Sequence, residues 1–181
     1  MANKRQEQAV IGRTRLSYAH LFKPHAFVAG GEENYSVVLL IDKKDKNYLA
    51  EIERAIEGGK QVGIEKGKWN SNVAKTIASP LHDGDNEFDN DGNPKYPGCY
   101  YLNTKSKTKP AIVDLDKNEI FNESEVYSGC YAKAVVTFFP YSFAGKKGLT
   151  TYINIVQKIE DGEPLGGGAS LSLLDDDSDL L

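Results

Sequence analysis

Four segments in the C-terminal half of the chain alternate apolar and polar residues with a period of two. They are residues 98–106, 111–115, 126–139 and 149–159, and turn-like residues such as 144–148 join them. Side chains of a β-strand point alternately to its two faces, so this pattern is typical of strands with one buried side. Residues 13–22 and the almost wholly apolar run 35–41 resemble two further strands. About six strands predict a small, mainly β barrel.

A single segment has the period of a helix instead. Between residues 45 and 57 the apolar residues recur at spacings of three and four, which places them on one helical face. Asp45 can cap the start of this principal helix, and the pair Gly58 and Gly59 is expected to end it. Residues 63–97 are rich in Gly, Asn, Asp, Ser and Pro. So long an irregular stretch in a compact domain is usually functional or mobile.

The length of 181 residues fits one domain with an appendage. Residues 164–181 contain glycines, serines and clustered aspartates but no Lys or Arg, so they lack the apolar surface that would offset the entropy lost on ordering. We therefore expect a disordered acidic tail. The net charge of −4 comes entirely from this tail, because residues 1–163 hold 22 acids and 22 bases. The four acids of the tail are Asp175, Asp176, Asp177 and Asp179.

The sequence argues against several classes of protein. It has neither a long apolar run nor a signal peptide, so we expect a soluble, cytosolic protein without a membrane partner. Cys99 and Cys130 are too few for a disulfide framework and are interpreted as small, partly buried strand residues. Residues 82–92 resemble part of a calcium-binding loop, but Gly98 stands where a bidentate Glu is needed, which favours a polar surface loop. Without a catalytic motif, we expect no enzymatic activity, no metal and no cofactor.

Residues 98–109 indicate a binding surface. Alternation separates a polar face with Tyr101, Asn103 and Lys105 from a core face with Leu102 and Thr104. Lysines neutralise phosphates, and flat rings stack on unpaired bases for about 1–3 kcal/mol each. The mixture favours sequence-tolerant binding of single-stranded nucleic acid. A lysine-rich edge strand that only prevents aggregation is the alternative.

Similar mixtures of aromatic and basic residues recur elsewhere in the chain. They include the start of the segment 131–139, the turn after residue 140, and the surroundings of Trp69, whose ring fits either a base stack or a core anchor. Two arginines near residue 14 add candidate phosphate contacts. We predict DNA contacts for Arg13, Arg15, Lys66, Lys68, Trp69, Tyr101, Asn103, Lys105, Lys107, Lys109, Tyr131, Lys133, Tyr141, Lys146, Lys147 and Tyr152.

Five ordered blocks carry a resemblance to a known family. They are RLSYAHLFKP, PLHDGD, YYLNTKSKTKPAIVD, YSGCYAKAVVTFFPY and KKGLTTYINIVQKIEDGEPL, and they span most of residues 13–165. The chain resembles a group of small phage proteins that are similar to single-stranded DNA-binding proteins with an oligonucleotide-binding (OB) fold. The resemblance implies an OB-type barrel and sequence-nonspecific binding of single-stranded DNA (ssDNA) in phage replication or recombination. It implies neither catalysis nor a cofactor.

The resemblance also gives a domain plan. We expect a flexible N-terminus over residues 1–12, an OB-fold ssDNA-binding domain over residues 13–163 and the disordered acidic tail over residues 164–181. The tail ends in Leu180 and Leu181, and we expect it to modulate DNA binding and to recruit replication or recombination proteins in the cytoplasm of the infected bacterial host. A homodimer is compatible with the sequence. Two alternatives stay open: a structural or interaction protein of the phage, and a metal-dependent nuclease.

Overall fold

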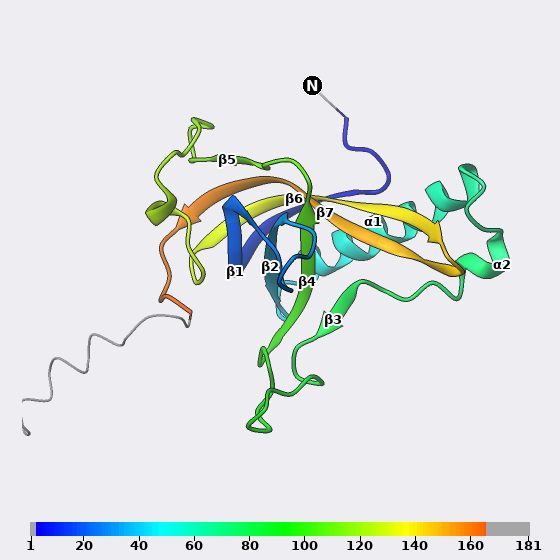
Figure 1. Cartoon of the computed structure of the whole chain (residues 1–181), viewed down its shortest axis with the longest axis horizontal. Coiled ribbons are helices and arrows are strands. Elements are labelled where there is room, and N and C mark those ends of the chain that lie inside the picture. The colour runs from blue at the N-terminus through cyan, green and yellow to red at the C-terminus, as the bar shows by residue number, and fades with distance from the viewer. Residues whose placement is uncertain (1–2, 166–181) are drawn as a thin grey trace, which may run out of the picture.

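The computed structural model describes residues 3–165 and consists of a strongly curved seven-stranded sheet with one long helix (Figure 1). The acidic tail proper, including its aspartates and final leucines, lies outside the described residues. The elements are β1 (Gln8–His25), β2 (Asn34–Asp42), α1 (Lys46–Glu65), α2 (Ser71–Ala74), β3 (Leu81–Asp83), β4 (Cys99–Ser106), β5 (Ala111–Val113), a 3₁₀ turn (Glu123–Glu125), β6 (Tyr131–Phe143) and β7 (Lys146–Glu160).

Five of the strands form a closed barrel. The sheet order is β3-β4-β2-β1-β6-β7-β5, and β4 also pairs with β7 in parallel, through Lys105 and Tyr152. The ring therefore runs β1, β2, β4, β7, β6 and back to β1, and every other pairing in it is antiparallel. Closure removes the free edges of these strands, and five strands are the number typical of the OB fold. The predicted small β-barrel is confirmed.

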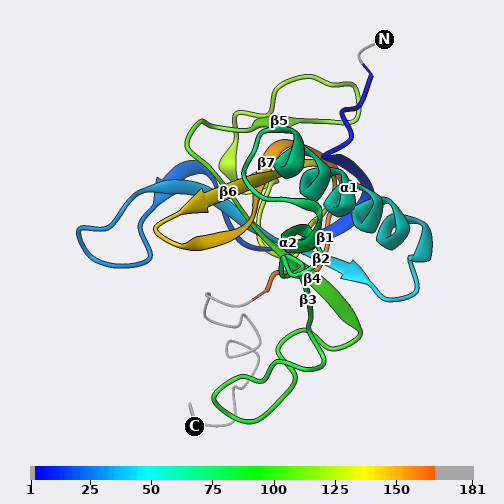
Figure 2. The same cartoon turned by 90° about the vertical axis from the view of Figure 1, so that its right-hand side faces the viewer.

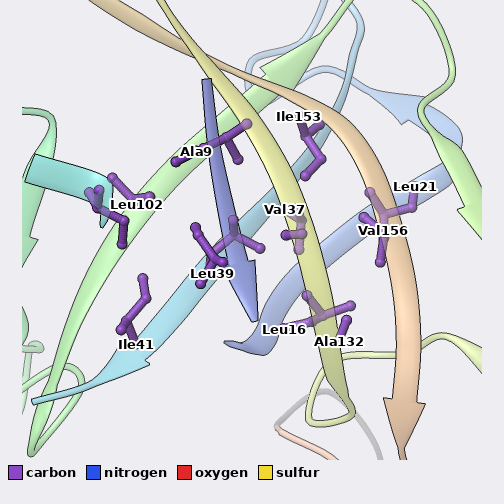
Figure 3. Packing of buried hydrophobic residues seen from close by; sticks show 14 of the residues in the cluster. Ala9, Leu16, Leu21, Val37, Leu39, Ile41, Leu102, Ala132, Ile153 and Val156 are labelled. Atoms are coloured by element: carbon purple, nitrogen blue, oxygen red, sulfur yellow. The ribbon is translucent and has the colours of Figure 1, made fainter. Parts of the chain in front are cut away.

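The barrel interior is filled by alternate residues of each strand. In Figure 3 the labelled side chains, Leu39, Leu102, Ala132 and Ile153 among them, point from different strands into one shared core. Fully burying a large apolar side chain contributes roughly 1.5–3 kcal/mol. Apolar residues of α1 belong to the same cluster, and this helix packs against β1 and β6 at one end of the barrel (Figure 2).

Helix α1 is longer than the sequence predicts. It continues through Gly58 and Gly59 to Glu65. Both glycines are buried where the helix crosses the barrel: a Cβ on Gly58 would lie 2.0 Å from the carbonyl oxygen of Gln6, and one on Gly59 would lie 2.7 Å from that of Phe138. A helical glycine costs about 1 kcal/mol relative to alanine, and close packing on the barrel outweighs that cost here. The prediction that these glycines end the helix was wrong.

Other boundaries also differ from the sequence-based expectations. Strand β1 begins at Gln8, and Ala9 and Ile11 are fully buried, so residues 8–12 belong to the barrel and not to a flexible arm. Asp45 precedes α1, but its side chain makes no capping hydrogen bond. Residues 63–97 contain the end of α1, the short α2 and strand β3. Tertiary contacts order these segments, although their local sequence pattern is weak.

The two cysteines lie where the alternation places them. Cys99 at the start of β4 is half-buried and Cys130 before β6 is fully buried, and both are free thiols. Burial raises the pKa of both, which is typical of unreactive structural cysteines. Among residues 3–165, no helix is long and apolar enough to cross a membrane.

Candidate nucleic-acid interface

The outer surface of β2 and β4 presents a row of polar residues. Residues that pair across strands share a face of the sheet, and the antiparallel register places Asn103 beside Val38 and Lys105 beside Ser36. Asn103 and Lys105 are exposed, whereas Leu102 and Thr104 between and beside them are buried. The predicted separation of a core face from a wet face is confirmed for these positions.

A groove of about 720 Å³ crosses this outer surface. Its titratable groups other than tyrosine are His82, Lys95, Lys105 and Lys147, and none of the described residues that line it is an acid. We call it the basic groove because its lining contains three lysines and no acid, although residues 1–163 as a whole carry no net charge. Its aromatic lining residues are Tyr18, Phe27, Tyr96 and Tyr141.

The basic groove lies where OB folds bind oligonucleotides, on the second and third barrel strands and the adjoining loops. Here these strands are β2 and β4, the first loop is residues 26–33 with Phe27, and the second is the β6–β7 hairpin with Tyr141 and Lys147. Figure 2 shows the β1–β2 loop, in blue, and the end of the hairpin, in gold, projecting on the same side of the barrel. The fold thus brings together cations and rings from distant parts of the sequence.

Tyr18, which lines the basic groove, has an unusual backbone conformation. It lies in an irregular part of β1, where the pairing register shifts between Ser17 and His20, and its φ is +46°. This left-handed region is costly for a residue with a Cβ, and such strain persists where surrounding structure enforces it. Bulges re-aim side chains, and the Tyr18 side chain is 61% exposed. Tyr18 is therefore held outward in the groove.

A second groove, of about 1200 Å³, adjoins the first, and Tyr18, Lys95 and Tyr96 line both. We call it the arginine groove because Arg13 and Arg15 line it, together with Tyr131. Its charge is mixed, since it also contains Asp42, Asp45 and Asp89.

Both arginines already have partners inside the protein. The guanidinium of Arg13 lies 4.1 Å from the centre of the Tyr131 ring and pairs with Glu160. Arg15 donates to the carbonyl oxygens of Gly129, at 3.1 Å, and Glu163, at 2.6 Å. The arginine groove therefore offers fewer free cations than its composition indicates.

Stacked histidines position the β1–β2 loop beside the basic groove. The rings of His20 and His25 are 4.2 Å apart and nearly parallel, and Phe27 packs edge-on against both. Burial lowers the pKa of His20, and the charge of His25 lowers it further. The neutral form of His20 is thereby favoured, which suits a stacked pair that would repel if both rings were protonated.

Tyr101, a predicted DNA contact, lies beneath the groove surface. It is only 3% exposed because β3 and the following loop cover it: its ring stacks on His82 and meets Tyr96 edge-on, at 5.0 Å each, and its hydroxyl donates to Glu87. The expected direct contact is therefore wrong. Tyr101 instead supports His82 and Tyr96, which line the basic groove.

The loop that covers Tyr101 is tied to the barrel by a lysine. Lys43 lies 2.7 Å from a carboxylate oxygen of both Asp83 and Asp85. These hydrogen bonds lower the pKa of both carboxyl groups. Two acids of the calcium-like segment thus bind a cation of the protein itself, which agrees with a polar surface loop.

The predicted DNA contact of Trp69 is also wrong, because this side chain is buried. Its side chain is 6% exposed, packs with Ala74 and Ile77, and donates from Nε1 to the carbonyl oxygen of Lys60 at 3.0 Å. The ring fills the space beside Gly63, where an added Cβ would lie 2.2 Å from it. Trp69 anchors the α1–α2 turn, which rules out the stacking role.

The remaining predicted contacts divide by location. Asn103, Lys105, Tyr141 and Lys147 line the basic groove, and Arg13, Arg15 and Tyr131 line the arginine groove. Lys107 pairs with Glu32, and Lys109 lies over the Phe22 ring. Outside the lining of both grooves lie Lys66, Lys68, Lys107, Lys109, Lys133, Lys146 and Tyr152.

Sequence reasoning missed five lining residues of the basic groove: Tyr18, Phe27, His82, Lys95 and Tyr96. The adjacent Lys95 and Tyr96 form a basic and aromatic pair of the same kind as those in residues 98–109 and 131–139. Tyr18 has no such signal, because its exposure depends on the bulge in β1.

The comparisons with known proteins agree with this architecture. The model of a family described as the ssDNA-binding protein of Enterobacter phage Enc34 matches residues 7–177. The chain belongs to this family. Protein p50 of Acyrthosiphon pisum secondary endosymbiont phage 1 is 30% identical over 174 residues, which cover 92% of this chain and 91% of that protein. The family is one of ssDNA-binding proteins and not of enzymes.

Solved structures share the fold as well. The ssDNA-binding protein of bacteriophage Enc34, in complex with ssDNA, superimposes with a TM-score of 0.68 at 24% identity, over 91% of this chain and 97% of that chain. The bacteriophage T7 ssDNA-binding protein gp2.5 gives a TM-score of 0.52 at 16% identity, over 93% and 92% of the two chains. The mainly β OB-type fold is therefore shown by structure as well as by sequence.

Proposed function

We propose that this chain binds ssDNA without sequence preference, through the basic groove, during phage DNA replication or recombination. The observation that carries the proposal is the acid-free lining of that groove, with Lys95, Lys105 and Lys147 beside four aromatic rings. Lysines neutralise phosphates of any sequence, and every base has a face on which a ring can stack. A groove built from these groups prefers single-stranded DNA, because the bases of a duplex are already stacked on one another and cannot stack on protein rings.

Removing two groove lysines tests this proposal. Lys95→Ala with Lys105→Ala is expected to reduce the dependence of log Kd on log salt by about 1.4, since each phosphate contact to a single strand contributes about 0.7. Fluorescence anisotropy of labelled oligo(dT) over a salt series measures this slope. Lys44→Ala, an exposed lysine outside both grooves, is the control. An unchanged slope in the double variant would place the DNA elsewhere.

The acidic tail is proposed to compete with DNA and to recruit replication or recombination proteins in the host cytoplasm. Two observations support competition: Pro164 and Leu165 line the arginine groove, which shares three lining residues with the basic groove, and the chain beyond them carries four aspartates. A tail that starts at the groove has a high local concentration there.

Deleting residues 166–181 is therefore expected to tighten oligo(dT) binding several-fold at about 20 mM salt and much less at about 300 mM, where screening is stronger. A full-length variant with asparagine at Asp175, Asp176, Asp177 and Asp179 separates charge from length, and it should match the deletion. Equal affinities of the deletion and the intact chain at low salt contradict the competition, while leaving the groove proposal intact.

A further inference from the structure

The β6–β7 hairpin carries an exposed row of aromatic side chains on the face that points away from the barrel core. Phe139, Tyr141 and Phe143 occupy alternate positions of β6, so their side chains leave the strand on one side, and they are 37%, 39% and 81% exposed. Of the residues with side chains on the other side of β6, Phe138 and Pro140 are buried, whereas Ser142 near the hairpin end is exposed. Such a run of exposed rings on one side of a hairpin is unusual for a soluble surface without a ligand.

Strand β7 adds polar and aromatic groups to the same face. The antiparallel register pairs Phe143 with Lys146 and Phe139 with Thr150. Tyr152 follows two positions later on β7, and its ring centre is 6.0 Å from that of Phe139. The outer hairpin face, as we call this surface, consists of Phe139, Tyr141, Phe143, Lys146, Thr150 and Tyr152.

A lysine from the end of α1 covers part of this face. The Nζ atom of Lys66 lies 4.8 Å from the centre of the Phe139 ring. With Lys146 at the hairpin end, the face therefore has cations next to its rings. Phosphates need the cations and unpaired bases need the rings, so this is the composition of a single-strand binding surface.

The outer hairpin face adjoins the basic groove, which Tyr141 and Thr150 of this face also line. Tyr141 belongs to both: Gly148, its partner on β7, has no side chain, and an added Cβ there would lie 2.7 Å from the tyrosine hydroxyl, so the ring lies across Gly148 to the groove. Lys105 of the groove pairs with Tyr152 across the β4–β7 junction. A DNA strand that leaves the groove at Tyr141 or Lys105 therefore reaches the aromatic and basic groups of the outer hairpin face directly.

We infer that the outer hairpin face is a second ssDNA subsite, which receives the nucleotides that extend beyond the basic groove. The inference rests on the proposed function of that groove. It assigns base stacking to Phe139 and Phe143 and phosphate contacts to Lys66 and Lys146. A short oligonucleotide fills the groove alone, whereas a longer one also covers the hairpin.

The test compares two lengths of oligo(dT): about 8 nucleotides, which is within the range of about 4–16 covered by one OB fold, and about 24 nucleotides, which is beyond it. Phe139→Ala with Phe143→Ala is expected to weaken binding of the longer strand by about tenfold or more and that of the shorter strand by less than about twofold. Phe121→Ala removes another exposed ring, 78% accessible, that lines neither groove, and it should change neither affinity. Thermal melting verifies that each variant is folded.

The outcomes separate the two proposals. Equal affinity of the double variant and the unmodified protein for the longer strand overturns the second subsite, and so does an equal loss on both lengths. If the double variant instead changes the oligomeric state in sedimentation while DNA affinity is unchanged, the face is a protein contact and the inference is wrong. Failure of the unmodified protein to bind either length would contradict the proposed function itself.

Discussion

Replacing Tyr18 with alanine is expected to weaken ssDNA binding by about tenfold, within the 1–3 kcal/mol that one base stack contributes. Tyr18 lines both grooves, and among the described residues it is the most exposed tyrosine. The bulge in β1 fixes the backbone from which this exposed ring projects, so the strand need not rearrange when a base stacks on it. Titration of labelled oligo(dT) into the variant measures the loss.

A glycine at the same position separates the ring from the backbone strain. Tyr18→Gly removes the same stacking surface but accepts a φ of +46° without the steric cost that a Cβ brings. It should bind as weakly as Tyr18→Ala and unfold at a higher temperature than that variant. Normal affinity of both variants would show that bases stack elsewhere.

Replacing Trp69 with alanine is expected to have the opposite pattern. The ring is buried against Ala74 and Ile77, and removal of a buried large aromatic side chain costs about 3–5 kcal/mol of unfolding free energy. For a domain of this size we expect the melting temperature to fall by about 10 °C, as measured by circular dichroism. The DNA affinity of the folded protein should stay within about twofold at low temperature.

Together the Tyr18 and Trp69 variants form a crossed comparison. Trp69 is the only tryptophan, and its ring is buried and hydrogen-bonded to Lys60, so its fluorescence should change little when DNA binds. A Trp69 variant that melts normally but binds DNA poorly would contradict the buried position. Strong quenching of the tryptophan by oligo(dT) would contradict it as well.

The barrel was predictable from sequence because alternation reports burial directly. The segments that contain Leu102, Ala132 and Ile153 have period two, and these residues fill the barrel interior. Gly58 and Gly59 misled the prediction because their reason is tertiary: they let α1 approach the barrel where a Cβ would clash. Helix propensity alone cannot distinguish a glycine that ends a helix from one that lets the helix pack closely against a neighbouring element.

The binding surface was predictable only in part. Lys105 and Asn103 follow from alternation, since their strand is regular and its other face is buried. Tyr101 is on the same face of the strand, but His82 of the neighbouring β3 and Tyr96 of the following loop cover its ring. No local pattern in residues 81–83 indicates the pairing of β3 with β4. Tyr18 depends on a bulge and Lys95 on the course of a long loop, so both required the structure.

The most direct test of the central claim is a comparison of single-stranded and duplex DNA of equal length over a series of salt concentrations. We expect the single strand to bind at least about tenfold more tightly at each salt concentration, with log affinity falling linearly with log salt as lysines release counterions from phosphates. Equal affinity for the two forms, or binding that is independent of salt, would contradict a groove that combines phosphate neutralisation with base stacking.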